Sequence, residues 1–170
     1  METRTNTAPA LSTLRAHHTQ ILAMMADLGS PSQNREALVR ELFVELRVHS
    51  ILEQQLLFPA VSRSLSHDRT KAAGIEFYPM LALMLELEQM NFTGAQFEQT
   101  LADIEQRFVG HVTSQHCHLF PELSSSPAGV DLAALDHRIE ERKIELNAML
   151  TGHTAVCSAT QSSPQHTRCA

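Results

Sequence analysis

The sequence is poor in the residues that mark several large classes of protein. Among 170 residues it has no Trp, one Tyr, six Gly and three Cys. Cys117, Cys157 and Cys169 show neither C-x-x-C spacing nor the density of a disulfide framework, which excludes a small disulfide-stapled domain. Cys117 is interpreted as a packing residue of a helix. Cys157 and Cys169 are interpreted as free thiols of a tail, although oxidising conditions could join them.

Excess positive charge and long apolar runs are also missing. The 13 Lys and Arg residues are outnumbered by 19 Asp and Glu, the net charge is -6, and no basic run or stripe exists, so we expect no nucleic-acid partner. No apolar run reaches the roughly 20 residues that span a membrane. The first residues lack the apolar segment of a signal peptide. We therefore expect a cytoplasmic protein without a membrane partner, and nothing in the sequence points to a particular protein partner.

Helix-forming residues with helical periodicity dominate the rest of the chain. Leu, Met, Ala, Glu and Gln are frequent, and apolar residues recur at three- and four-residue spacing. The periodicity predicts helices over about 11–28, 34–58, 76–90 and 95–120, and a fifth over about 131–150. Mostly short links between similar helices favour antiparallel neighbours. The predicted fold is all-α: an antiparallel up-down four-helix bundle with an additional C-terminal helix.

Proline and glycine mark the predicted boundaries. Gly29-Ser30-Pro31 ends the first helix, Pro59 ends the second and Pro121 ends the fourth. Pro79 is expected either in the first turn of the third helix, where a missing N–H does no harm, or at a kink of that helix. The domain organisation that follows is a disordered lead (1–10), the bundle (11–123), a C-terminal helix packed on it (131–150) and a disordered tail (151–170).

Three of the bundle helices carry a histidine in their apolar stripe: His18, His49 and His111. Glu53 lies one turn beyond His49 on the same face. Imidazole with carboxylate is a ligand set for iron, zinc or manganese. A single histidine among leucines is more often a hydrogen-bonded core residue, and Glu53 alone could pair with a nearby arginine. The coincidence of three such histidines with an aligned carboxylate favours a metal site.

These residues fall in segments that resemble the hemerythrin-like (HHE cation-binding) family. Residues 49–59, H-S-I-L-E-Q-Q-L-L-F-P, resemble the signature that ends the second helix of these proteins. Residues 111–121 repeat the same His-to-Pro spacing. Residues 14–21, L-R-A-H-H-T-Q-I, resemble the first-helix pattern, with His18 in the ligand position and His17 in place of an acid. The resemblance covers about residues 11–123.

The resemblance implies a four-helix bundle around a di-iron centre held by histidines and usually two bridging carboxylates. We therefore expect non-haem iron, two ions per chain, that reacts with or senses oxygen, peroxide or nitric oxide. The alternative is a helical binding or regulatory module whose degenerate site holds one metal ion, zinc or iron, or none. No phosphate loop or nucleophile triad is present, so the sequence names no catalytic residue and does not decide whether the protein is an enzyme.

The third helix departs from the family pattern because it has no histidine. Tyr78, the only tyrosine of the chain, stands in that position. A phenolate is a hard anionic donor suited to ferric iron, whereas the simpler interpretation is packing beside Pro79. His67 is a rival donor in a polar stretch that is interpreted as a solvated loop.

The fourth helix departs further, because Gln115 and His116 stand where the second carboxylate should be. Glutamine cannot bridge as an anion, although His116 could bind a metal terminally. His118 returns to roughly the same face, and Glu45 could substitute unless it is a surface residue. The predicted ligands are His18, His49, Glu53, Tyr78, His111 and His116, with His18, Tyr78 and Glu53 on one ion and His49, His111 and a fourth-helix side chain on the other.

Overall fold

The computed structural model describes residues 11–30, 34–62, 77–92, 94–125 and 130–160. The side chains of residues 77, 78 and 152–160 also lie outside the description. Helices account for nearly all of the described residues, and none of these residues is in a strand. No helix in the described ranges is both long enough and apolar enough to cross a membrane.

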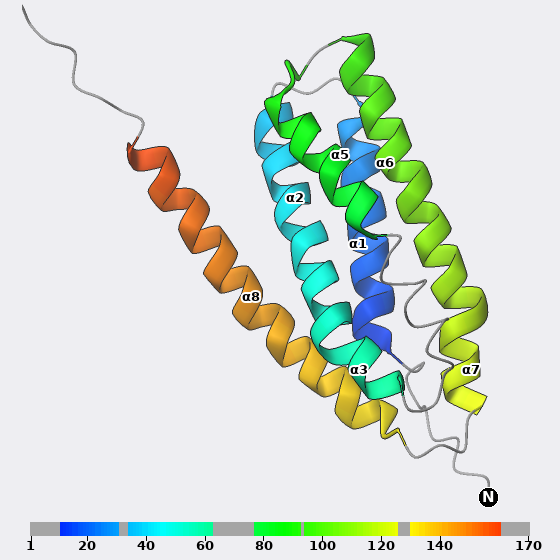
Figure 1. The fold of residues 1–170 in the computed structure, drawn as a ribbon. Helices are drawn as coiled ribbons and strands as arrows, with labels where there is room; N and C mark the ends of the chain where they lie inside the picture. Colours follow the sequence, from blue (N-terminus) through cyan, green and yellow to red (C-terminus); the bar gives the residue numbers. More distant parts are fainter. Residues whose placement is uncertain (1–10, 31–33, 63–76, 93, 126–129, 161–170) are drawn as a thin grey trace, which may run out of the picture.

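Four helices form an up-down bundle (Figure 1). They are α1 (Ser12–Leu28), α2 (Arg35–Leu52), α5 (Phe77–Gln89) and α6 (Ala95–Ser114). Pro79 is the third residue of α5, in its first turn as predicted. With the additional helix at the C-terminus, this architecture confirms the predicted all-α fold class.

The second and fourth helices do not end at their prolines, as the sequence had suggested. Each passes through a π-helical turn, η1 (Glu53–Leu57) or η2 (Gln115–Leu119), and continues as α3 (Phe58–Val61) or α7 (Phe120–Ser125). A proline ring clashes with the carbonyl four residues before it, and a widened turn relieves that clash. The prolines therefore mark a change of helical pitch and not a helix end.

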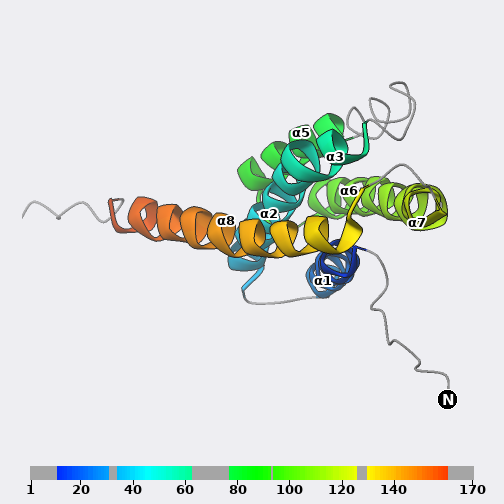
Figure 2. The ribbon, with the colours of Figure 1, turned by 90° about the horizontal axis from the view of Figure 1, so that it is seen from below.

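The C-terminal helix α8 (Leu132–Thr160) packs on α1, α2 and η1. Figures 1 and 2 show its first half against the bundle and its second half leaving it. The helix continues through residues 151–160, which were expected in a disordered tail. No proline interrupts this stretch, because the next one is Pro164, and Gly152 destabilises a helix by only about 1 kcal/mol relative to alanine. Met149, in the second half of this helix, is 55% exposed.

Helix α8 also fixes the start of α1. Leu11 has a positive φ of 59°, which is uncommon for a non-glycine residue, and its side chain is fully buried. The Asp136 carboxylate accepts hydrogen bonds from the Ser12 hydroxyl at 2.6 Å and the Thr13 N–H at 3.0 Å. An acceptor from another helix thus takes the place of the usual N-cap side chain.

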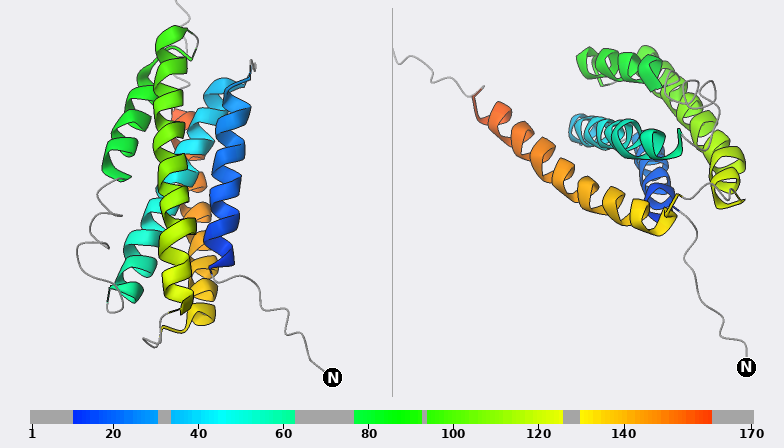
Figure 3. Two further views of the ribbon diagram at one scale, coloured as in Figure 1. Left: turned by 90° about the vertical axis from the view of Figure 1, so that its right-hand side faces the viewer. Right: turned by 60° about the horizontal axis from the view of Figure 1, so that its bottom comes forward.

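Two hydrophobic cores lie along the bundle, with polar residues between them. One core is formed by α1 from Ile21 onward, the first half of α2, α5 and most of α6. The other joins the start of α1, the end of α2, η1, α3, α7 and α8. Figure 3 shows these elements from two further sides. Between the two cores three helices contribute buried polar residues: His18 from α1, His49 from α2, and His111 and Gln115 from α6 with η2.

Candidate metal centre

Four buried side chains from different parts of the chain converge between the two cores. His18, His49, Glu53 and His111 each offer one donor atom, and these atoms all lie within 4.8 Å of one another. Each of the four residues is 5% exposed or less. The structure thus brings together four of the six predicted ligands, because each sits in the inward stripe of its helix.

The donor atoms are too close and too many for ordinary hydrogen bonding. His49 Nε2 lies 3.3 Å from His18 Nε2 and 3.2 Å from His111 Nε2. It also lies 3.2 Å from Glu53 Oε1. One ring nitrogen has either one proton or one lone pair, so it cannot serve three such partners. Donor atoms that converge in this way fit a shared cation.

Burial and charge favour the protonation states that bind metal. Burial, reinforced by the neighbouring imidazoles, lowers the pKa of His18 to about 2. Burial alone would raise the pKa of Glu53, but the charges and hydrogen bonds of His49 and His111 hold it well below its usual value. A neutral imidazole and an ionised carboxylate are the forms that coordinate a metal ion.

Gln115 occupies the position of the missing carboxylate and faces the group. Its side chain is 2% exposed, and its amide nitrogen donates a hydrogen bond to Glu53 Oε1. Its Oε1 atom is buried and has no hydrogen-bond partner among the described atoms. A buried acceptor without a partner is costly, and a bound cation nearby would explain it.

His116 lies beside the group but not in it. Its Nε2 atom is 3.0 Å from Nδ1 of His18, the ring nitrogen that does not face His49. Its side chain is half-buried, and burial followed by the charge of Arg15 lowers its pKa. The prediction that His116 binds metal stays a prediction. His118 is exposed, and so is Cys117, which was expected to pack.

The remaining predicted donors fall outside the described residues. Tyr78 belongs to α5, but its side chain is not described, and His67 lies in residues 63–76, which are not described at all. The predicted role of Tyr78 as a ligand therefore stays a prediction.

The sequence did not reveal a pair of side chains next to the centre, His17 and the partly buried Glu45. His17 is fully buried, and its Nε2 atom lies 2.7 Å from Glu45 Oε2. Burial lowers the pKa of His17 to about 4 against the opposing effect of Glu45. The His17 ring meets the His49 ring edge-on at 5.3 Å. Glu45 is therefore engaged with His17 and not with the four donors.

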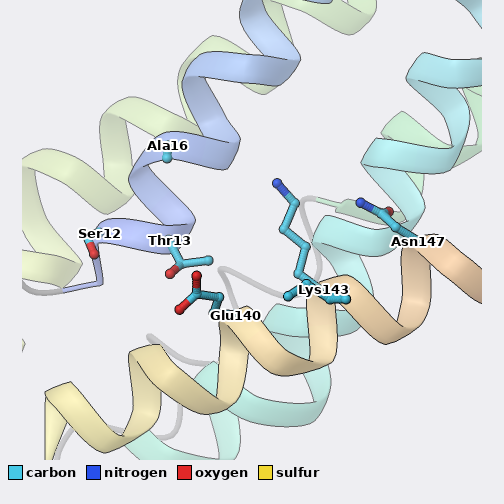
Figure 4. A pocket seen from close by; sticks show the side chains of 7 residues that line it. Ser12, Thr13, Ala16, Glu140, Lys143 and Asn147 are labelled. Atoms are coloured by element: carbon cyan, nitrogen blue, oxygen red, sulfur yellow. The ribbon is translucent and has the colours of Figure 1, made fainter.

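Helix α8 closes this flank of the bundle. Asn147 Nδ2 lies 3.4 Å from Glu45 Oε1, and Lys143 Nζ donates to Gln20 Oε1 at 2.9 Å. A groove of about 540 Å³ lies between α1 and α8 (Figure 4), lined by Ser12, Thr13, Ala16, Glu140, Lys143, Ile144 and Asn147. The lining includes none of the four converging donors, so the groove is separate from the candidate centre.

The fold is that of a hemerythrin-like helical bundle, and the donor group within it is a candidate metal site. The structure is similar to the crystal structure of a hemerythrin HHE cation binding domain-containing protein from Mycobacterium kansasii, with a TM-score of 0.71 and 19% identity over 92% of this chain and 95% of that chain. At this identity the similarity shows the fold, which agrees with the resemblance seen in the sequence. No protein-family model matches the chain, and no curated protein matches it significantly.

Proposed function

We propose that this chain is a non-haem iron protein whose iron reacts with or senses oxygen, peroxide or nitric oxide. The observation that carries the proposal is the buried group of His18, His49, Glu53 and His111, whose donor atoms lie within 4.8 Å of one another. Nitrogen and carboxylate donors in this combination suit iron.

The protein would hold and shield the metal. His18, His49 and His111 would act as neutral donors, and Glu53 would supply negative charge. The two hydrophobic cores on either side exclude water from the group. Bound iron would supply one-electron redox chemistry and a coordination site for a small molecule. The half-buried His116 contacts His18 and is partly exposed to solvent.

The test is metal loading by protein purified from iron-fed cells, measured by elemental analysis and visible spectroscopy. His49→Ala should abolish loading, because His49 contacts the other three donors. His137→Ala is the matched control, because His137 is exposed on α8 and should leave the metal content unchanged. Equal metal content in the two variants would contradict the assignment. Spectral change on adding peroxide or nitric oxide to the wild type then tests the reactivity.

The second candidate is a degenerate bundle that binds one zinc ion or serves as a metal-free binding module. Gln115 favours it, because an amide stands where a carboxylate was expected. Three histidines and one carboxylate can also satisfy four-coordinate zinc. Zinc as the only metal in protein from iron-fed cells would favour this candidate.

A further inference from the structure

The spacing of the four buried donors is that of ligands around a single ion. With bonds of about 2.0–2.2 Å, neighbouring ligand atoms of one ion lie roughly 3 to 3.5 Å apart. The separations from His49 Nε2 to the other three donor atoms are 3.2 to 3.3 Å. Terminal ligands of two ions about 3.5–4 Å apart lie on opposite sides of the pair and spread to roughly 7 Å. All four donor atoms here lie within 4.8 Å, so they do not divide into two sets.

Gln115 does not supply the negative charge that a second cation requires. Two cations in one buried site repel each other strongly unless anions lie between them. The Gln115 side chain is neutral, and its amide nitrogen donates to Glu53 Oε1. Gln115 therefore holds an oxygen of Glu53, the one carboxylate of the group, without adding negative charge.

Among the side chains that the structure describes, the other nearby candidates for a second ion are engaged elsewhere. Nε2 of His116 contacts Nδ1 of His18, the ring nitrogen that does not face His49. His116 therefore orients His18 as a ligand. Glu45 is bonded to His17 at 2.7 Å and to Asn147, on the flank covered by α8. Neither side chain is a member of the converging group.

We infer that the centre is mononuclear, with one ion held by His18, His49, Glu53 and His111, and that the neutral Gln115 side chain provides no charge to hold a second ion. The inference rests on the proposed function, since it requires the group to bind metal. A pair of irons, which the family resemblance implies, does not fit the donors that the structure brings together. Restoring a carboxylate at position 115 should therefore make room for a second ion.

The experiment compares metal content per chain and electron paramagnetic resonance in the full-length wild type, Gln115→Glu and Gln115→Leu. We expect one iron and an isolated high-spin ferric signal in the wild type. Gln115→Glu should double the iron content and quench that signal, because a bridged ferric pair is antiferromagnetically coupled. Gln115→Leu removes the amide without adding charge, and should stay at one ion.

The possible results separate this inference from the proposed function. A wild type with two coupled irons overturns the mononuclear centre but leaves the proposed iron protein standing. A wild type that binds no metal overturns the proposed function. A folded Gln115→Glu variant that still binds one ion overturns the role of Gln115. If that variant does not fold, the resonance signal and metal content of the wild type decide between one ion and two.

Discussion

The two π-helical turns of the bundle have the same form and different chemistry. A histidine lies four residues before the first residue of each turn, and a Phe-Pro pair follows the last residue of each turn. In each, the first side chain is buried and faces the centre: Glu53 in η1 and Gln115 in η2. One side chain is an anion and the other a neutral amide. The repeated backbone thus delivers two polar groups to one place, but only one of them carries charge.

Their surroundings differ as well. η1 lies under α8, and Leu57 at its end belongs to the core that α8 helps to form. η2 is more open, with Cys117 and His118 exposed and His116 half-buried. π-helical turns often occur at functional sites, and here one serves a covered ligand while the other lies near solvent. The asymmetry leaves the charged side chain, Glu53, in the covered turn and the neutral amide, Gln115, in the more exposed turn.

The largest effect is expected from making the two turns chemically alike. Glu53→Gln keeps the shape and one acceptor oxygen but removes the charge of the group. Loss of residues that merely support metal ligands costs roughly 10- to 100-fold in affinity, so loss of this ligand should cost more than about 100-fold. Metal titration of the apoprotein measures the change, and Glu41→Gln, on the exposed face of α2, is the control.

The double variant Glu53→Gln/Gln115→Glu moves the charge from one turn to the other. If the two turns are equivalent in geometry, it should bind metal better than Glu53→Gln alone. Affinity no better than that of the single variant would mean that the cover of α8 over η1 matters as much as the charge.

A fall in pH should lower the stability of the metal-free protein through the buried His17. The pKa of His17 is lowered from 6.5 to about 4, mainly by burial. Between these values the unfolded chain binds a proton that the native state excludes, so stability falls as pH decreases through this window. At about 1.4 kcal/mol per pH unit, the interval from 6.5 to about 4 amounts to roughly 3 kcal/mol.

Urea denaturation of the apoprotein at a series of pH values measures this loss. His17→Gln should flatten the dependence between pH 4 and 6.5, the window set by the shifted pKa. His137→Gln, at an exposed position of α8, should not. An unchanged slope in His17→Gln would mean that other buried groups, His18 among them, govern the acid response.

The sequence predicted the centre better than it predicted the helix ends. Periodicity placed His18, His49, Glu53 and His111 inward, and all four are buried. Which side chains share the inward face of a helix depends only on helical geometry, so the spacing of residues in the sequence predicts it directly. The π-helical turns were not predicted, because they depend on how a proline clash is relieved and not on hydrophobic pattern.

The His17–Glu45 pair shows what spacing within one helix cannot reveal. In the sequence, His17 stands where the family pattern has an acid, and Glu45 is a possible substitute for the missing carboxylate. Both interpretations consider each residue within its own helix. Their pairing depends on the angle between α1 and α2 and on the cover that α8 provides. Lys143 and Asn147 lie four residues apart on one face of α8, and this polar spacing was the signal in the sequence. It could be connected to Glu45 only once the packing of α8 on the bundle was known.

The smallest effect is expected from loosening α8 over η1. Asp136→Ala removes the acceptor that caps the start of α1, and loss of such a cap typically costs about 1 kcal/mol. Asp136→Asn keeps a carbonyl acceptor and should cost less. Because α8 packs on η1, hydrogen exchange in Asp136→Ala should rise more at Glu53–Leu57 than at Gln115–Leu119. Equal increases in the two turns would show that α8 supports the bundle as a whole, and the difference between the turns would then lie in the charge of Glu53 alone.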